Sequence, residues 1–518
     1  MPVFEHQSHL PFSREDVFAW YSRPGALVRL HPPFAGEVKQ EPSDGLQEDS
    51  RSALGINLPG IWGTSLTALS GLIGSQLRLP LRTQLTWHAR HTDFSPGRGF
   101  ADDMVSGPAA QWFHERQFSD EGDGTLLSEQ VHYELPLPRR TPSAVSAAVT
   151  SRFEAELRRI FDYRARQTVA ELAFHQSHGT LASSGSSAGA PPVPPVHVVA
   201  VSGASGLVGR QVCALLGGAG IEVRPMVRRS SAGAQSSAGA QSSAGAQEGQ
   251  RVIVWDPAAQ ELDPDEFADV DAVIHLAGHP LAGRFTEKHK QKVRASRVQG
   301  TDLIARALAH AESRDSRGRV LVSGSAVGFY GARPADRTHQ QQLLTEDLPA
   351  GTDFLADVCW EWEQATAPAH RAGVRVATVR TGIVQSPAGG VLQQMLPLFA
   401  VGMGGPLGGD QWQSWISIDD IASLIVHAAL EPSVEGPING VAPEPVTAGE
   451  YAKTLGDVLH RPSAIPVPGF GPALLLGRQG ARELAMADQR ASAEHARSSG
   501  FGFRHTTLAA ALRHVLGR

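Results

Sequence analysis

Residues 197–209 read HVVAVSGASGLVG, and this stretch decides the fold of the region around it. A short apolar strand leads into Gly203, Gly206 and Gly209, and an apolar helical pattern follows. One glycine allows a tight turn, the second lets the backbone approach a pyrophosphate, and the third lets the helix pack on the strand. The helix N-terminus then offers free N–H groups to the anion. A chain with 54 glycines can form such a triplet by chance, so the flanking strand and helix carry the prediction of a dinucleotide site.

Composition limits the class of protein. With 518 residues the chain is long enough for two or three domains. A net charge of -6 argues against a nucleic-acid partner, and no apolar run is long enough to span a membrane. The N-terminus lacks the pattern of a signal peptide, and the two cysteines, Cys213 and Cys359, show no metal-ligand spacing. We therefore expect a cytoplasmic protein without disulfides or bound metal, acting on a small molecule, with an oligomeric state that the sequence leaves open.

Two low-complexity segments mark the organisation of the chain. Residues 169–195 are expected to be a flexible linker, because from about Gln176 they are rich in Ser, Gly, Ala and Pro. Residues 230–249 hold SSAGAQ repeated three times and are expected to be a disordered surface insert. The expected regions are therefore an N-terminal domain (1–168), the linker, a dinucleotide-binding domain (196–393) and a substrate-side C-terminal segment (394–518).

Beyond the linker, predicted strands alternate with helices. The expected strands are 197–201, 222–227, 252–255, 272–276, 320–323 and 374–379, and the expected helices include 287–310 and 353–370. Such alternation is typical of βαβ units. The fold class is therefore α/β, a Rossmann-type doubly wound parallel sheet.

The N-terminal domain has a different pattern. Strand-like stretches at 81–91, 110–118 and 125–133 are separated by turns, and a final helix carries Phe153, Leu157, Ile160 and Phe161 on one face. This pattern predicts an α+β helix-grip domain, in which a curved antiparallel sheet holds one long helix around an apolar cavity.

The strand ends of the second region bear on the choice of cofactor. The second strand ends in Arg228-Arg229 without an acidic residue, which favours NADP(H) with Arg228 on the 2′-phosphate. The alternative is that both arginines merely solvate a loop. Asp256 ends the third strand, where it would meet the adenine or simply cap a turn. The fourth strand leads into Leu276, Ala277 and Gly278, which let the backbone pass beside the cofactor.

These features resemble the extended and atypical short-chain dehydrogenase/reductase superfamily, and within it the NAD-dependent epimerase/dehydratase-like branch. The matching stretches are SGASGLVG (202–209), SRVQGT (296–301), SGSAVGFYG (323–331), RTGIV (380–384), GMGGPLGGDQWQSWISIDDIA (402–422) and VPGFGPALLLG (467–477). The resemblance implies further cofactor contacts at Ser205, Leu207, Val208, Arg297 and Ser323, and a small uncharacterised domain at the C-terminus.

The N-terminal region resembles the SRPBCC (START-like) helix-grip superfamily, on the stretches HLPFSREDVFAWYSRPGALVRLHPPF (9–34) and GPAAQWFHERQF (107–118). The resemblance implies an apolar ligand in its cavity. His31, His88, His114 and Glu115 are polar candidates for the lining, although such residues more often lie at the surface or serve as ordinary hydrogen-bonding groups.

The superfamily's acid–base pair, Tyr-x-x-x-Lys, is absent, since none of the five tyrosines is followed by Lys four residues later. The helix that should carry it reads DFLADVCWEWEQ (353–364). Ser325 matches the catalytic serine in position, and Tyr330 is expected either to exchange a proton near the nicotinamide or to pack on the cofactor. Glu361, Arg380 and Trp415 are further candidates.

Two classes of function remain open from sequence. The first is an NADP(H)-dependent oxidoreductase or epimerase that uses Ser325 and possibly Tyr330. The second is a non-catalytic nucleotide-binding regulator or sensor with a ligand cavity in the N-terminal domain. In a third arrangement, the N-terminal domain presents an apolar substrate to the reductase site.

Overall fold

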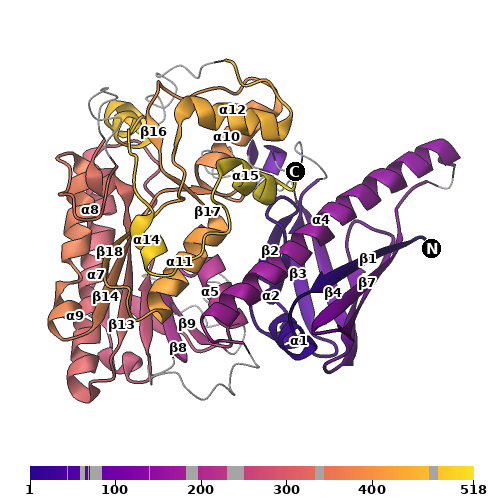
Figure 1. The fold of residues 1–518 in the computed structure, drawn as a ribbon, viewed down its shortest axis with the longest axis horizontal. Helices are drawn as coiled ribbons and strands as arrows, with labels where there is room; N and C mark the ends of the chain where they lie inside the picture. Colours follow the sequence, from indigo (N-terminus) through magenta and orange to yellow (C-terminus); the bar gives the residue numbers. More distant parts are fainter. Residues whose placement is uncertain are drawn as a thin grey trace.

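The computed structural model describes the chain except for residues 44, 59–62, 64, 68, 71–83, 139, 182–195, 230–249, 333–342 and 466–475. The SSAGAQ insert and most of the expected linker therefore lie outside the described residues. The second half of the chain is built on an eight-stranded sheet with the order β11-β10-β9-β8-β12-β13-β14-β18 (Figure 1). Its strands are β8 (Val198–Ser202), β9 (Glu222–Arg228), β10 (Ile253–Asp256), β11 (Glu261–Leu262), β12 (Ala272–His275), β13 (Val320–Ala326), β14 (Arg375–Thr381) and β18 (Gly436–Gly440). All pair in parallel except β11, which confirms the Rossmann-type sheet.

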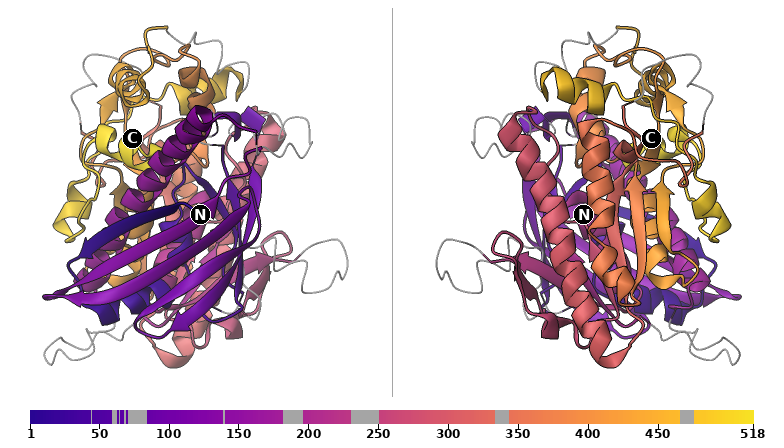
Figure 2. Two further views of the ribbon diagram at one scale, coloured as in Figure 1. Left: turned by 90° about the vertical axis from the view of Figure 1, so that its right-hand side faces the viewer. Right: turned by 90° about the vertical axis from the view of Figure 1, so that its left-hand side faces the viewer.

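Helices cover both faces of this sheet. On one face lie α7 (Glu287–Asp315), α8 (Phe354–Gln364) and α9 (Ala367–Arg371), and on the other lie α5 (Leu207–Gly218) and α11 (Ile418–Leu430) (Figures 1 and 2). Strand β8 serves both cores, because side chains alternate along a strand. Val199 and Val201 pack on the α5 and α11 side, and Ala200 packs on the α7 side. Burial of both faces explains the unbroken apolar run before Gly203.

The dinucleotide-binding domain (196–393) and the C-terminal segment (394–518) share structural elements across their expected boundary. Helix α10 (Gly390–Ala400) runs across it, and both β18 and α11 return to the parallel sheet. The C-terminal segment also forms short strand pairs, β15 (Ile383–Gln385) with β17 (Trp415–Ser417) and β16 (Trp412–Gln413) with β19 (Val446–Thr447). The remaining elements are η4 (Ala481–Ala485) and the helices α12 (Ala448–Leu459), α14 (Glu494–Ser498) and α15 (Leu508–Leu516).

The N-terminal domain is a seven-stranded antiparallel sheet crossed by a long helix, as expected (Figure 2). In chain order its strands are β1 (Val3–Leu10), β2 (Gly36–Gln40), β3 (Arg51–Ile56), β4 (Leu85–Ser95), β5 (Gly99–Ser106), β6 (Gln111–Glu121) and β7 (Gly124–Glu134). Helices α1 (Arg14–Ser22) and α2 (Ala26–Leu30) follow β1, and α4 (Ser143–Ser177) crosses the sheet. The predicted apolar face of α4 packs Leu157 and Phe161 against Phe4, Val131 and Tyr133 of the sheet.

Part of the segment expected to be a linker is helical. Helix α4 continues to Ser177 and so includes residues 169–177. Leu172 and His175 in this last part are fully buried, which provides the tertiary packing that local composition does not reveal. Of the expected linker, only residues 182–195 lie outside the described chain.

The N-terminal domain packs against α5, the first helix of the parallel sheet. A Cβ atom on Gly25 would lie 2.3 Å from the Ala214 carbonyl oxygen, and one on Gly217 would lie 2.5 Å from the Pro24 carbonyl oxygen. Backbone therefore meets backbone at this junction. This close approach holds the turn before α2 against the second half of α5.

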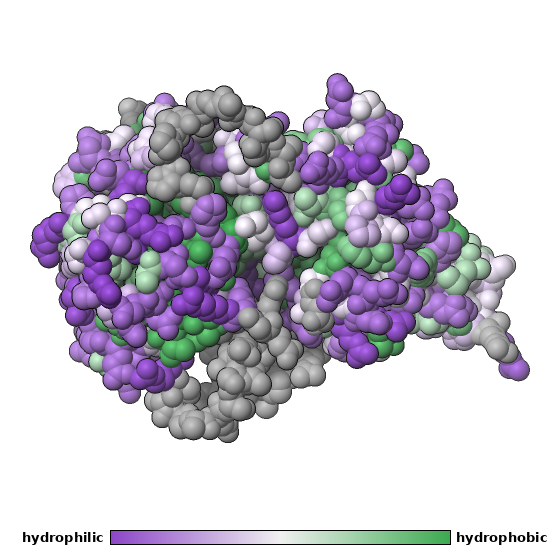
Figure 3. Space-filling view, turned by 90° about the horizontal axis from the view of Figure 1, so that it is seen from below, coloured by the Kyte–Doolittle hydropathy of each residue, from purple (hydrophilic) through white to green (hydrophobic). Residues whose placement is uncertain are grey.

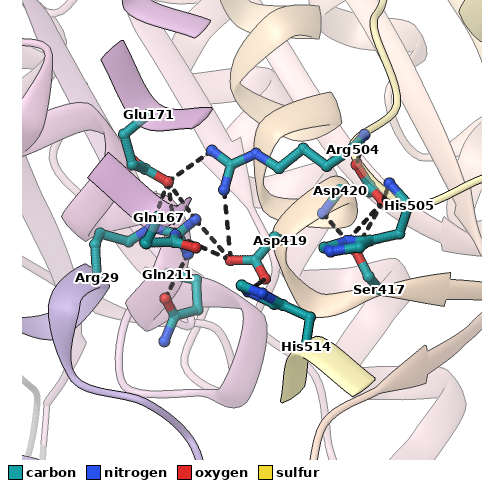
Figure 4. A network of polar contacts seen from close by, with 10 residues as sticks. All are labelled: Arg29, Gln167, Glu171, Gln211, Ser417, Asp419, Asp420, Arg504, His505 and His514. Carbon is teal, nitrogen blue, oxygen red and sulfur yellow. Dashed lines mark hydrogen bonds and ion pairs between the residues drawn. The ribbon is translucent and has the colours of Figure 1, made fainter. Parts of the chain in front are cut away.

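A buried polar network, which we call the junction network, holds the same contact. It joins α2, α4, α5, α11 and the C-terminal tail through Arg29, Gln167, Glu171, Gln211, Asp419, Arg504 and His514 (Figure 4). Arg29 donates to Glu171 at 2.5 Å, to Asp419 at 2.8 Å and to Gln211 at 2.6 Å. Burial alone would raise the pKa of Asp419, but Arg29, His514 and Arg504 outweigh it and hold that pKa well below its usual range.

A second group of contacts lies beside the junction network. Asp420 accepts hydrogen bonds from Ser417 and from the backbone N–H groups of Arg504 and His505 (Figure 4). These contacts anchor the C-terminal tail at the first turn of α11. The tail is thereby part of the junction and not an independent appendage.

The surface seen from below is mostly hydrophilic, and its hydrophobic residues form small separate patches (Figure 3). Within the described part of the chain, no helix is long and apolar enough to cross a membrane.

Candidate functional site

The glycine turn between β8 and α5 has the geometry that a pyrophosphate needs. Gly203 has φ +74°, and a Cβ atom there would lie 2.8 Å from the carbonyl carbon of Leu276. A Cβ atom on Gly209 would lie 2.1 Å from the Gly203 carbonyl oxygen. The first and third glycines are therefore required by the turn and by the close packing of α5.

The middle glycine faces open space. Gly206 donates its N–H to the Gly203 carbonyl at 2.9 Å, and an added Cβ atom would meet only that oxygen, at 3.1 Å. Gly206 is also the N-cap of α5, and no side chain caps the helix. Ser205 and Gly206 are exposed, whereas Leu207 and Val208 are half-buried. The uncapped first turn of α5 therefore fits a phosphate group, which backbone N–H groups and the helix dipole would bind.

Arg228 and Arg229, at the end of β9, differ in their ion pairing. Arg229 forms an ion pair with Glu261 at 2.5 Å, whereas exposed Arg228 has no ion pair with any residue that the structure describes. Arg228 pairs in register with Trp255 of β10, so it lies at the carboxyl edge of the sheet. Its guanidinium therefore remains available to an anionic group.

Asp256, at the end of β10, is engaged in its own turn. One carboxylate oxygen accepts hydrogen bonds from the backbone N–H groups of Ala258 and Ala259, both at 3.0 Å. This is the turn-capping alternative that the sequence left open. Its second oxygen is available for the adenine contact.

The end of β12 lies directly against the glycine turn. Leu276 donates its N–H to the Ser202 carbonyl at 3.1 Å, and Ala277 follows at the same edge. Arg297 of α7 covers exposed Gly278, where a Cβ atom would lie 3.3 Å from the Arg297 guanidinium carbon. Arg297 donates to the carbonyls of His279 and Val293 and lies over the Trp362 ring at 5.1 Å. It forms no ion pair with any described residue.

Ser325 lies near the end of β13, which continues to Ala326, three residues farther than expected. Its hydroxyl donates a 2.7 Å hydrogen bond to Glu363 of α8. Glu363 in turn accepts two hydrogen bonds from Arg380 of β14, both at 2.9 Å. Ser323, two residues earlier, is fully buried and donates to the adjacent Gly324 carbonyl, so its hydroxyl faces the interior.

On this helix the sequence offered Glu361 as a base if buried, with an exposed position as the alternative, and did not point to Glu363. Glu361 is one-third exposed and pairs with Arg294 at 3.3 Å, whereas Glu363 is mostly buried. Helical spacing could have identified Glu363, because it lies one turn beyond Cys359 on the buried face of α8. Both cysteines, Cys213 and Cys359, are free, and no metal-binding cluster occurs among the described residues.

The sequence left two roles open for Tyr330, proton exchange near the nicotinamide or packing without catalysis, and the structure places its side chain in the interior. Its side chain is 1% exposed, and its hydroxyl donates to Asn439 at 2.8 Å and accepts from Arg380 at 3.0 Å. Burial raises the pKa of Tyr330, and the nearby Arg380 lowers it by less. Tyr330 therefore holds Arg380 and β18 in place. Trp415 is also buried, with its indole N–H on the Glu444 carbonyl, and lies in the core.

The polar residues that the sequence offered as cavity-lining candidates in the N-terminal domain lie in three different places. His114 lines a cavity of about 130 Å³ inside the domain. His31 instead lines a second cavity, of about 260 Å³, between this domain and α5, together with Ser205 and Leu207. His88 and Glu115 lie at the surface, where His88 bonds to Ser106 and Glu115 to Gln117, so neither lines a cavity.

Comparison with known proteins agrees with this geometry. Residues 199–439 match the NAD dependent epimerase/dehydratase family, and residues 467–515 match a domain of unknown function. An epimerase family protein of Mycobacterium bovis is 36% identical over 315 residues, which cover 60% of this chain and 95% of that protein. A chloroplastic epimerase family protein of Arabidopsis thaliana is 40% identical over 246 residues, covering 47% of this chain and 68% of that protein.

Two solved structures are similar as well. A nucleoside-diphosphate sugar epimerase of Corynebacterium glutamicum has a TM-score of 0.70 and 31% identity, covering 100% of this chain and 90% of that one. The match therefore extends over the N-terminal domain. A human epimerase family protein, solved with NADPH, has a TM-score of 0.50 and 28% identity, covering 62% of this chain and 99% of that one. The chain thus belongs to the NAD dependent epimerase/dehydratase family.

Proposed function

We propose that this protein is an NADP(H)-dependent oxidoreductase or epimerase that acts on a hydroxyl or carbonyl group of a small molecule. The observation that carries the proposal is the Ser325–Glu363 hydrogen bond at the end of β13, on the same carboxyl edge of the sheet as an intact glycine turn. Ligands of open α/β sheets bind at this edge. NADP(H), when bound, would supply or accept the hydride.

The glycine turn and Arg228 support NADP(H) as the cofactor. The uncapped first turn of α5 fits the pyrophosphate, and Arg228 has no competing carboxylate among the described residues, so it fits a 2′-phosphate. The human relative solved with NADPH supports this choice over NAD. Arg297 lies over Gly278 at the same edge and would contact the cofactor from α7.

Ser325 and Glu363 replace the missing tyrosine and lysine in this proposal. When a substrate hydroxyl is oxidised, its proton passes to Ser325 Oγ, while the proton already on Oγ passes to Glu363 Oε1. Reduction of a carbonyl runs the two transfers in reverse. Arg380 positions Glu363 by its two hydrogen bonds and is itself held by Tyr330.

The same contacts favour a second candidate, a nucleotide-binding regulator without catalysis. Arg380 already donates two hydrogen bonds to Glu363, so this carboxylate has a structural role in joining α8 to β14. In either case we propose that the N-terminal domain is an SRPBCC-like helix-grip domain, since a seven-stranded antiparallel sheet encloses a cavity with α4.

Cofactor choice is tested by measuring the Kd of NADPH and NADH for the wild type, Arg228→Ala and Arg229→Ala. Hydrogen bonds to charged groups are worth about 1.5–3 kcal/mol, so NADPH should bind about 10- to 100-fold more tightly than NADH. Arg228→Ala should remove most of this difference. Arg229→Ala is the matched control, because Arg229 already pairs with Glu261. Equal wild-type affinities would refute the NADP(H) assignment.

Catalysis is tested by following NADPH absorbance with a panel of carbonyl compounds, and then comparing Ser325→Ala, Glu363→Gln and Glu361→Gln on any substrate found. Loss of a general base costs about 10²–10⁴-fold in rate, so the first two variants should lose activity while still binding NADPH. Glu361→Gln controls for loss of a carboxylate on the same helix. If no compound oxidises NADPH, or if Glu363→Gln matches Glu361→Gln, the regulatory candidate is favoured.

A further inference from the structure

The cavity inside the N-terminal domain differs from the apolar cavity that the sequence led us to expect. One side is apolar and includes Trp87, Trp112 and Leu54. The two indole rings meet edge to face, with their centroids 4.8 Å apart. The other side is charged and includes Asp102, His114, Arg116, Glu129 and Arg164; Arg23, Glu41 and His91 line the same cavity.

Both carboxylates on the charged side have close partners. Arg116 donates to Asp102 at 2.5 Å, and Glu129 lies 3.1 Å from His114 and 3.6 Å from Arg116. Burial lowers the pKa of His114, and Arg116 lowers it further, so this imidazole is neutral at pH 7. Hydrogen bonding therefore satisfies these groups without any ligand.

Arg164 is different. It projects from α4 into the cavity, with its guanidinium carbon 5.1 Å from the centre of the Phe161 ring. It makes no hydrogen bond or ion pair with any residue that the structure describes, and its Nε atom is buried without an acceptor. A buried donor without an acceptor costs about 1–3 kcal/mol. An arginine has five N–H donors and no acceptor, so the group that satisfies it must supply oxygen or nitrogen lone pairs.

The net charge of the cavity lining indicates whether the ligand group that accepts hydrogen bonds from Arg164 is charged or neutral. Glu41, Asp102 and Glu129 carry three negative charges, and Arg23, Arg116 and Arg164 carry three positive ones, so the lining is neutral overall. A charged ligand would leave one buried charge uncompensated, which is costly in a desolvated site. An uncharged carbonyl-type oxygen accepts hydrogen bonds without that cost.

We propose that this cavity binds a small uncharged molecule that has one ring and one carbonyl-type oxygen. The oxygen accepts hydrogen bonds from Arg164, and the ring packs against Trp87, Trp112 and Leu54. The volume of about 130 Å³ fits this size, because an apolar cavity of about 150 Å³ holds benzene. This site is separate from the glycine turn and does not depend on the proposed function, and its oxygen contact goes beyond the apolar ligand that the family resemblance implies.

The test is calorimetric titration of the full chain with three probes, in the absence of NADPH so that no reduction contributes. Acetophenone has the ring and the oxygen, ethylbenzene has a similar shape without the oxygen, and benzoate carries a charge. Acetophenone should bind about tenfold more tightly than ethylbenzene, which corresponds to about 1.4 kcal/mol. Benzoate should bind more weakly than acetophenone.

Two variants test whether Arg164 donates the hydrogen bond to the ligand oxygen. Arg164→Met should bring acetophenone to the affinity of ethylbenzene, whereas Arg166→Met, an exposed position on the same helix, should change neither affinity. The wild-type series is decisive even if Arg164→Met folds poorly. Equal affinities for acetophenone and ethylbenzene, tightest binding of benzoate, or no saturable binding of acetophenone up to its solubility limit would each overturn the proposal.

Discussion

Arg29 is the residue on which the junction between the two domains most depends. Its side chain is 1% exposed and donates to Glu171, Asp419 and Gln211. Arg29→Met keeps a side chain of similar length but removes all three contacts, and two buried carboxylates then share Arg504. Removal of one partner from a buried ion pair costs about 3–5 kcal/mol, so the free energy of unfolding should fall by that amount.

The loss should depend on pH in a defined direction. Burial raises the pKa of Glu171, but Arg29 and Arg504 outweigh it, and the pKa of Asp419 is held even farther below its usual range. Groups with a lowered folded-state pKa stabilise the fold above their unfolded-state values of 4.5 and 3.8, and the benefit is lost as pH falls through the folded-state pKa. The gap between wild type and Arg29→Met should therefore be full at pH 7 and shrink below about pH 4.

The assay is urea unfolding at pH 7, followed by tryptophan fluorescence and by far-UV circular dichroism to check that both report one transition. Arg166→Met is the surface control. The double variant Arg29→Met/Glu171→Gln restores a balanced charge, so it should lose less than the sum of its single variants, by about 0.5–3 kcal/mol. A loss in the free energy of unfolding of less than about 1 kcal/mol for Arg29→Met would contradict this role of Arg29. So would a double variant whose loss equals the sum of the losses of its single variants.

Other predictions concern the sheet edge and one buried histidine. Burial lowers the pKa of His275 from 6.5 to about 3, so His275 stays neutral in the fold and stability should fall by about 1.4 kcal/mol for each pH unit below 6.5. His275→Asn should flatten that slope in unfolding titrations between pH 6.5 and about 4, and an unchanged slope would assign the acid sensitivity to other groups. Gly206→Ala should fold normally, because its Cβ atom meets only one oxygen, yet bind NADPH about tenfold more weakly because that atom occupies the space for the phosphates. Gly209→Ala should instead lower the melting temperature, since its Cβ atom would overlap the Gly203 carbonyl, and equal melting temperatures for the two variants would contradict this division of roles.

The glycine turn was predictable because its information is local. A strand, three glycines and a helix follow one another within about twenty residues, and the backbone torsions that they require depend on residue type. Gly203 does adopt the left-handed φ that this turn needs. The alternation of strands and helices was predictable for the same reason, and the ends of the six strands expected in the parallel sheet differed from the structure by three residues or fewer.

The pair that we propose for proton transfer, Ser325 and Glu363, was only partly predictable from the sequence. Position along the chain identified Ser325, but its partner Glu363 lies 38 residues away and becomes a partner only when α8 packs on the sheet. The sequence left two roles open for Tyr330 for the same reason. Its hydroxyl donates to Asn439, which lies 109 residues away and belongs to the last strand of the sheet.

The class of fold, the place of the glycine turn and the absence of the usual tyrosine–lysine pair could be read from the chain alone, because each depends on neighbouring residues. Which charges meet depends on the packing of distant segments. Arg29 and Asp419 are 390 residues apart, and Arg164 Nε is left without an acceptor by the residues that surround it in the described part of the chain. A side chain's ionisation and its need for a partner depend on burial and on the charges around it, and these exist only once the chain has folded.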